Sequence, residues 1–313
     1  MMFVTLSLNP AIDQTVELDE LRPGAVNLAR GALRHAGGKG INVAACLADW
    51  GAAPIVTGLL GEANDAPFNA LFFARGIDDR CIRIPGETRT NIKLLDLGRG
   101  DTTDINLPGT APGAEALDAA LAALHAAIRP GSIAVLAGSL PPGLPAETYA
   151  ELVALLSEQG ARVVVDASGA ALSAVLAAPV LPHAIKPNRF ELEGWIGRPL
   201  PDQAALLAAA RALVARGIAL VAVSLGAEGA LFVAADAAVR VHPPSIAVGS
   251  SVGAGDAMVA GIAAGLGEGV PLEALARRAA AFSAAKLQEA GARLPGRAAV
   301  EAIAATIHVE PLA

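Results

Sequence analysis

Short apolar runs alternate with helical periodicity through the middle of the chain, and this alternation is the feature that most restricts the fold. The apolar runs lie at 133–137, 162–166, 183–186 and 218–224. Helical spacing of apolar residues predicts helices at 114–128, 146–159, 170–177, 188–195 and 202–215. Strands that alternate with helices in this way predict a three-layer α/β fold, whose mainly parallel central sheet is covered by helices on both faces.

The N-terminal third follows the same rhythm but is interrupted twice. Strands are predicted at 3–8 and 54–60, with helices beginning at Gly38 and spanning 65–75. Two polar, irregular segments, 12–36 and 87–107, do not fit, and the second has the turn signals of a hairpin. We expect them to pair into a small β-sheet that forms a lid on a single domain of residues 1–313.

A glycine-rich stretch, Val248–Met258, leads into an apolar run at 259–266 that is expected to be helical. This places Gly253, Ala254, Gly255 and Asp256 at a helix N-terminus. Glycines allow a tight turn, and the first N–H groups of a helix lack helical acceptors, so the arrangement predicts an anion-binding hole that suits phosphate.

Asp256 has two interpretations at this position. An aspartate is a favoured cap of a helix N-terminus. A carboxylate beside a phosphate hole can instead take a proton from an attacking hydroxyl. The stretch by itself favours neither. If Asp256 is the base, the helix N-terminus is expected to keep it ionised and therefore weakly basic.

Polar or glycine-rich residues follow almost every predicted strand. Asp13 is expected in the turn after the first strand, and the other positions are Gly138-Ser139, Asp166, Lys186-Pro187-Asn188, Ser224-Leu225-Gly226 and Gly253–Asp256. Because ligands of open α/β sheets bind at the carboxyl ends of the strands, this clustering predicts a binding site there.

Asn188 and Glu191 are three residues apart at a predicted helix start, hence on one face. Amide and carboxylate oxygens suit Mg²⁺, which is often held through water. The alternative is that Glu191 only stabilises the helix N-terminus by its charge.

Several classes of function are disfavoured. A formal net charge of −7 argues against nucleic acid as a partner. Cys46 and Cys81 show neither a disulfide framework nor metal-ligand spacing. No signal peptide or membrane span is apparent, so we expect a cytoplasmic protein. Gly38-Lys39-Gly40 lacks the other residues of a Walker loop, and no dinucleotide fingerprint occurs.

These stretches resemble the ribokinase-like (PfkB) carbohydrate kinases, within them the branch of 1-phosphofructokinases and tagatose-6-phosphate kinases. The resemblance spans about Thr5 to Gly296. The matching stretches are Leu8-Asn-Pro-Ala-Ile-Asp13, Ala36-Gly-Gly-Lys-Gly-Ile-Asn-Val-Ala44, Thr88-Arg-Thr-Asn-Ile-Lys93, Thr103-Asp-Ile-Asn106, Gly138-Ser-Leu-Pro-Pro-Gly143, Ile185-Lys-Pro-Asn-Arg-Phe-Glu-Leu192, Val223-Ser-Leu-Gly-Ala-Glu-Gly-Ala-Leu231 and Val252-Gly-Ala-Gly-Asp-Ala-Met258.

The resemblance implies an ATP- and Mg²⁺-dependent kinase of a phosphorylated ketohexose, with fructose 1-phosphate the first candidate. Asp256 would be the base, and the amides of Gly253, Ala254 and Gly255 would stabilise the transferred phosphoryl group. The other roles implied are Lys186, Asn188, Ser224, Gly226 and Gly229 for the nucleotide; Asn188 and Glu191 for Mg²⁺, through water; Asp13, Gly38 and Asn42 for sugar hydroxyls; and Lys39, Arg89, Asn91 and Ser139 for the substrate phosphate.

Lys39 and Arg89 are expected to be hydrated in the open cleft and to need an anion when the lid closes. The resemblance also implies a homodimer formed through the lid. Two alternatives stay open: a tagatose-6-phosphate kinase or 6-phosphofructokinase of the same family, and a non-catalytic sensor of nucleotide or sugar phosphate.

Overall fold

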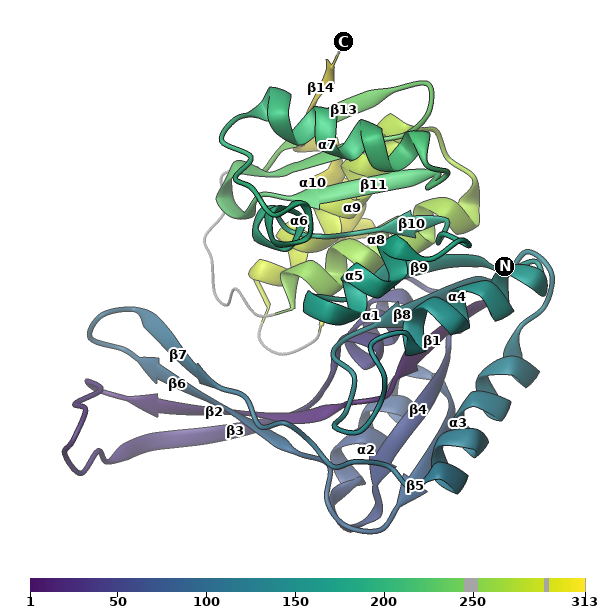
Figure 1. The fold of residues 1–313 in the computed structure, drawn as a ribbon. Coiled ribbons are helices and arrows are strands. Elements are labelled where there is room, and N and C mark those ends of the chain that lie inside the picture. Colours follow the sequence, from purple (N-terminus) through teal and green to yellow (C-terminus); the bar gives the residue numbers. More distant parts are fainter. Residues whose placement is uncertain (245–252, 290–292, 313) are drawn as a thin grey trace.

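The computed structural model describes residues 1–244, 253–289 and 293–312, and it has the three-layer α/β architecture predicted from the sequence (Figure 1). Its large sheet has the strand order β14-β13-β12-β11-β10-β9-β8-β1-β4-β5 within the described residues. The strands from β5 to β11 along this order are parallel, and β12, β13 and β14 pair antiparallel at the other edge.

The bounds of the elements are as follows. The strands of the large sheet are β1 (Phe3–Ser7), β4 (Ile55–Gly61), β5 (Asp78–Ile84), β8 (Ile133–Ala137), β9 (Arg162–Asp166), β10 (Ala184–Ile185), β11 (Leu220–Ser224), β12 (Ala230–Val233), β13 (Ala238–His242) and β14 (His308–Leu312). The helices are α1 (Lys39–Asp49), α2 (Ala66–Arg75), α3 (Ala114–Ala127), α4 (Thr148–Glu158), α5 (Gly169–Ala177), α6 (Arg189–Ile196), α7 (Gln203–Ala215), α8 (Ala254–Glu268), α9 (Leu272–Leu287) and α10 (Arg297–Thr306), with short 3₁₀ turns η1 (Glu62–Asn64) and η2 (Gly226–Glu228).

The central strands are buried on both faces because successive side chains point to opposite sides. In β8, Ala134 and Leu136 pack into the core that also contains residues of α3 to α7. Ile133 and Val135 point the other way, into the core shared with α1, α8 and α9. This double burial explains why these strands are continuous apolar runs in the sequence rather than alternating ones.

A second sheet, in the order β3-β2-β6-β7, extends away from the large one (Figure 1). Its strands are β2 (Ala11–Leu18), β3 (Ala29–Gly37), β6 (Thr90–Asp96) and β7 (Asp101–Ile105), which come from the two segments that interrupt the α/β rhythm. β6 and β7 form the hairpin expected from the sequence.

Two local predictions were wrong. Asp13 lies inside β2, not in a turn, because the chain continues after Pro10 as a strand in which Asp13 pairs with His35 and Asn91. β5 was not predicted, since its sequence Asp78-Asp-Arg-Cys-Ile-Arg-Ile84 is half charged. A charged strand is typical of a sheet edge, which is where β5 lies.

Cys46 and Cys81 are buried free thiols, as expected. Among the helices of the described residues, none combines the length and apolarity that crossing a membrane requires.

Candidate active site

The candidate site lies at the carboxyl ends of the parallel strands, where the N-termini of α1 and α8 meet them. Side-chain contacts join residues far apart in the chain: Asn42 with Asp256, Lys39 with Asp166, and Asn9 with Ser139. The polar residues that follow the strands in the sequence therefore converge on one edge of the sheet.

The N-terminus of α1 depends on two glycines. Gly38, the residue before the helix, has φ of +110°. A Cβ at Gly40 would stand 2.4 Å from the carbonyl oxygen of Leu6, so only glycine lets α1 pack its backbone against β1. This close approach orients Lys39 and Asn42, on the first turns of the helix, toward the end of the sheet.

The predicted anion hole is formed at the N-terminus of α8. Gly253 precedes the helix in the left-handed conformation, with φ of +80°, and no side chain of the described residues is seen to cap the helix. The N–H groups of the first turn are thus left for a ligand. The upstream part of the predicted stretch, Val248 to Val252, lies outside the described residues.

Asp256 is buried next to this hole. Its side chain is 7% exposed, and its Oδ2 accepts a hydrogen bond of 2.7 Å from Nδ2 of Asn42. Burial raises the pKa of Asp256 to about 6, against the opposing effect of Lys39. The expectation of a weakly basic carboxylate was therefore wrong: loss of hydration outweighs the helix N-terminus, and the carboxylate has a pKa suited to a general base.

Asp166 joins the two sides of the site, a role that the sequence did not reveal. Its buried carboxylate lies 2.9 Å from Nζ of Lys39 and 3.3 Å from Nζ of Lys186. Although burial alone would raise it, the two lysines hold the pKa of Asp166 below its usual value. The sequence did contain a signal. Asp166 ends a predicted parallel strand, Lys186 follows another, and Lys39 begins a predicted helix at the same edge of the sheet.

The proposed sugar side is already an organised set of contacts. Asp13 lies 3.2 Å from Nζ of Lys93 and accepts a hydrogen bond of 3.3 Å from Asn91. Oδ1 of Asn42 and Oδ1 of Asn91 are buried without a hydrogen-bond partner in the described part of the chain. Buried acceptors without partners are uncommon in folded proteins, so these two oxygens are candidates for contact with a ligand.

Arg89 and Lys39 both have partners within the folded chain. Arg89 donates to the backbone carbonyl oxygens of Asn9, at 3.0 Å, Pro10, at 3.2 Å, and Leu107. Lys39 is ion-paired with Asp166, and its side chain is 38% exposed. These partners were not foreseen from the sequence, whereas the exposure of Lys39 agrees with a cation that is hydrated in the open cleft.

A pocket of about 520 Å³ adjoins the anion hole on the other side. Ser224, Gly226 and Gly229 line it together with Ala254 and Gly255 of the first turn of α8. Nζ of Lys186 lies 3.7 Å from where a Cβ on Gly255 would stand. Three of the residues predicted to bind a nucleotide, Ser224, Gly226 and Gly229, thus line a mostly apolar pocket that adjoins the predicted phosphate hole, whereas Lys186 and Asn188 are not among its lining residues.

Asn188 and Glu191 form a reciprocal capping box at the start of α6. The backbone N–H of Glu191 donates to Oδ1 of Asn188 at 2.9 Å, and the backbone N–H of Asn188 donates to Oε2 of Glu191 at 2.8 Å. Glu191 therefore does stabilise the start of the helix, as the alternative interpretation expected, but through a hydrogen bond, and Asn188 caps the same helix, which was not predicted. Oε1 of Glu191 takes no part in the box, so the pair can still serve a metal that keeps most of its waters.

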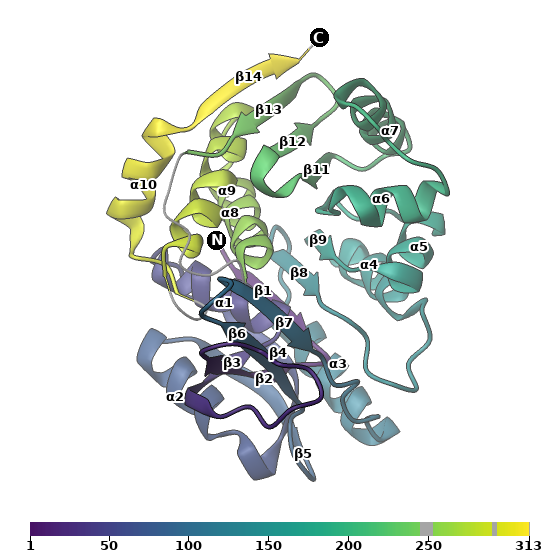
Figure 2. The same cartoon turned by 90° about the vertical axis from the view of Figure 1, so that its left-hand side faces the viewer.

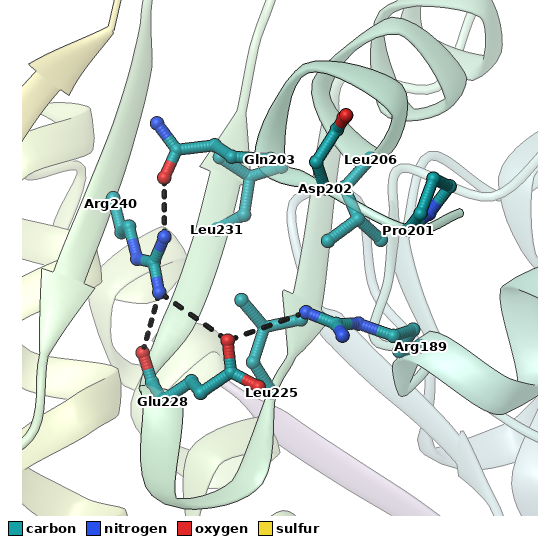
Figure 3. Close-up of a pocket in the computed structure, with 9 residues that line it drawn as sticks. All are labelled: Arg189, Pro201, Asp202, Gln203, Leu206, Leu225, Glu228, Leu231 and Arg240. Carbon is teal, nitrogen blue, oxygen red and sulfur yellow. Dashed lines mark hydrogen bonds and ion pairs between the residues drawn. The ribbon is translucent and has the colours of Figure 1, made fainter.

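A smaller pocket of about 100 Å³ lies beside η2 (Figure 3). Glu228, in this turn, is 3.5 Å from Arg189 and 3.8 Å from Arg240, and Arg240 also donates to Gln203. These contacts connect the turn to α6, α7 and β13. They hold in place the segment between Gly226 and Gly229, the glycines that line the larger pocket.

Fold and site together are those of a phosphotransferase: a buried carboxylate lies next to the N-terminus of α8, with a pocket on one side and polar side chains on the other. The sequence matches the family described as pfkB family carbohydrate kinase over residues 6–298, and the chain belongs to that family.

Its relatives cover nearly the whole chain. It is 55% identical over 293 residues to a 1-phosphofructokinase of Xanthomonas campestris pv. campestris, covering 93% of this chain and 92% of the relative. It is 46% identical to a 1-phosphofructokinase of Rhodobacter capsulatus, with 98% and 97% covered. Among solved structures it resembles phosphofructokinase-2 from Escherichia coli in complex with substrates and products, with a TM-score of 0.91, 31% identity, and 97% and 99% covered.

Proposed function

We propose that this chain transfers a phosphoryl group from ATP to a hydroxyl of fructose 1-phosphate, giving fructose 1,6-bisphosphate. The observation that carries the reaction type is the pairing of buried Asp256 with the uncapped N-terminus of α8. The identity of 55% to a 1-phosphofructokinase, over nearly its whole length, supports the choice of sugar.

In this proposal Asp256 accepts the proton of the attacking hydroxyl, and the N–H groups of Gly253, Ala254 and Gly255 stabilise the phosphoryl group in transfer. Phosphoryl transfer depends mainly on positioning and on neutralising charge on the phosphoryl oxygens. Lys186, Asn188, Ser224, Gly226 and Gly229 would hold the nucleotide. The pocket at Ser224 and Gly226 has the apolar lining expected for an adenosine group.

On the acceptor side, Asp13, Gly38 and Asn42 would bind the sugar hydroxyls. Lys39, Arg89, Asn91 and Ser139 would bind the existing phosphate, which requires Arg89 to exchange backbone carbonyls for a phosphate oxygen when the sugar binds. The small sheet would then act as a lid that excludes water from the reaction.

The test is the rate of ADP formation with fructose 1-phosphate, tagatose 6-phosphate and fructose 6-phosphate as acceptors. We expect the highest kcat/KM with fructose 1-phosphate. A higher value for either other sugar would assign the chain to that kinase, and tight binding of ATP and sugar phosphate without turnover would make it a sensor.

We further propose a homodimer formed through the small sheet. Val26, Leu28 and Leu33 are 90%, 84% and 53% exposed on this sheet and its connecting loop. Exposed apolar side chains grouped on one element favour a protein partner. Sedimentation of the purified chain measures this, and a monomer at assay concentrations would contradict it.

Arg89→Ala is expected to lower kcat/KM for fructose 1-phosphate at least about tenfold, because charge-assisted hydrogen bonds contribute roughly 1.5–3 kcal/mol each. The activity on fructose, which has no phosphate, should change little. Arg80→Ala is a matched control, since among the described residues Arg80 is paired with Asp78 alone, on the edge strand β5. Equal losses on both sugars, measured above the dimer dissociation constant, would show that Arg89 holds the small sheet in place and does not clamp the phosphate.

We also propose that Mg²⁺, when bound, neutralises the ATP phosphates, with Asn188 and Glu191 orienting it through water. Glu191→Gln separates this role from helix capping, because a glutamine can complete the capping box but carries no charge. We expect Glu191→Gln to raise the Mg²⁺ concentration needed for half-maximal rate several-fold and to leave the melting temperature unchanged.

Glu191→Ala is the companion variant, which removes both the cap and the charge. It should lower the melting temperature as well as weaken the Mg²⁺ response, since loss of a cap costs about 1 kcal/mol. If the Mg²⁺ concentration for half-maximal rate is the same in Glu191→Gln and in the unchanged protein, Glu191 serves only to cap the helix.

A further inference from the structure

Two lysines flank the N-terminus of α8, and only one of them has a carboxylate partner in the described residues. Nζ of Lys186 lies next to Gly255, and Lys186 is ion-paired with Asp166. On the other side, Cε of Lys286 lies 3.3 Å from where a Cβ on Gly253 would stand. The hole is therefore bounded by positive charge at both glycines.

Lys286 is on the last turn of α9, which packs beside α8 (Figure 2). It is 2% exposed, and its ammonium donates a hydrogen bond of 3.1 Å to the backbone carbonyl oxygen of Glu289. Within the described part of the chain, no carboxylate lies within ion-pairing distance of it. One turn earlier, Ser283 donates to the carbonyl oxygen of Ala254 at 2.9 Å, which fixes this face of α9 against the first turn of α8.

This placement of a cation is unfavourable for folding in two ways. Burying an ammonium group without an ionic partner loses hydration that a single carbonyl does not replace. The N-terminus of a helix also carries partial positive charge, which repels a cation. Burial accordingly lowers the pKa of Lys286, although Cys46 and Asp256 act in the opposite direction. These terms are partly offset because Lys286 lies on the last turn of α9, and the C-terminus of a helix favours a cation.

The unfavourable terms reverse when an anion enters the hole. We propose that Lys286 is a positioning residue for phosphoryl transfer, whose buried ammonium stands behind the amides at Gly253 and strengthens their attraction for the phosphoryl group. The proposal rests on the function proposed above. A fixed charge in a site that excludes water acts more strongly than in solution and needs no rearrangement during the reaction.

Lys286→Met tests the charge while nearly keeping the shape. We expect kcat to fall at least about tenfold and KM for the sugar to stay within about twofold, because the interaction is made with the transferring group. The melting temperature should stay the same or rise, since an unpaired buried charge is removed. A residue with only a structural role would give the opposite pattern, a lower melting temperature with kcat retained.

Arg278→Met is the matched control on the same helix. Arg278 lies 2.8 Å from Glu268 and 5.1 Å from the centre of the Trp50 ring, so it is a paired cation outside the site. We expect this variant to lose melting temperature and to keep kcat. If Lys286→Met behaves like Arg278→Met, the proposal is overturned.

Chemical rescue of kcat by a small cation is a second test. Such rescue is not expected if Lys286 has only a structural role. Lys286→Ala leaves space for a small cation, and methylammonium should restore part of its kcat while having no such effect on the unchanged protein. Tetramethylammonium, which cannot donate a hydrogen bond to the Glu289 carbonyl, should not restore it. Absence of rescue together with unchanged kcat in Lys286→Met would contradict the proposal.

A failure of the proposal for Lys286 can be distinguished from a failure of the proposed function. If the unchanged protein phosphorylates none of the three sugar phosphates, the proposed function fails. In that case the proposal for Lys286 is tested by the affinity of the unchanged protein and of Lys286→Met for ADP with aluminium fluoride. This complex mimics the phosphoryl group in transfer, and calorimetry measures its binding. Weakening of at least about tenfold in Lys286→Met supports the charge at the hole, and equal affinity overturns it.

Discussion

Asp256→Asn is expected to lower kcat by about 10²–10⁴-fold, the usual contribution of a general base. Asparagine keeps the size of the side chain and an oxygen that can accept from Asn42, so the affinity for both substrates should be retained. The measurement is kcat of the purified variant under saturating substrates. Retention of more than about a tenth of the original kcat would exclude Asp256 as the base.

The pH dependence follows from the raised pKa of Asp256. The ionised form is the base, so kcat/KM should fall tenfold per unit as pH decreases below about 6, the pKa of this carboxyl. The kcat/KM of Asp256→Asn should not show this decrease at acid pH. Glu268→Gln, at the other end of α8, is the control, because it removes a carboxylate from the same helix and should leave the profile unchanged.

Stability should change in the opposite direction to activity. The pKa of Asp256 is higher in the folded protein than in the unfolded chain, so folding is opposed wherever the group is ionised. Asp256→Asn should therefore be more stable at pH 7, by an amount on the order of 2–3 kcal/mol, and this difference should disappear near pH 4. Urea unfolding at both pH values measures it.

Asp166→Asn is expected to reduce both stability and activity. The substitution leaves Lys39 and Lys186 near each other without their shared carboxylate. Removing one partner of a buried ion pair costs about 3–5 kcal/mol. We place the loss in free energy of unfolding toward the lower end, about 3 kcal/mol, because Lys39 is partly exposed and can regain water. Loss of order in the two lysines proposed to bind phosphate groups should lower kcat/KM about 100-fold.

The pH dependence of stability distinguishes this ion-pair role from simple packing. Since the folded-state pKa of Asp166 is depressed, its stabilising effect is present at neutral pH and is lost as pH falls below the ordinary aspartate value. The difference in unfolding free energy between the unchanged protein and Asp166→Asn should therefore shrink in acid. A difference that is the same at pH 7 and pH 3 would assign the effect to packing.

Most of the architecture was accessible from the sequence because it depends on local signals. The strands β8, β9 and β11 and the helices from α3 to α7 follow from apolar runs and apolar periodicity over 5 to 14 residues. The hairpin of β6 and β7 follows from its turn residues. The same local signals did not reveal β5, whose charged side chains lie at a sheet edge, where burial does not select apolar residues.

The positions of the candidate site residues were also accessible, since each follows a strand or begins a helix. Their chemical states were not. Lys39 and Asp166 are 127 residues apart, and Asn42 and Asp256 are 214 residues apart. A pKa, an ion pair or the contacts of a guanidinium group depend on what the folded chain brings within a few ångströms.

The sequence by itself thus determined the α/β alternation, the glycine-dependent turn at Gly253, and the gathering of polar residues at one edge, because these depend on backbone geometry and short-range periodicity. Only the tertiary structure decided that Asp256 has a raised pKa, that Asp166 holds two lysines and that Arg89 binds backbone carbonyls. The physical reason is that desolvation and ion pairing act between neighbours in space, and these neighbours come from distant parts of the chain.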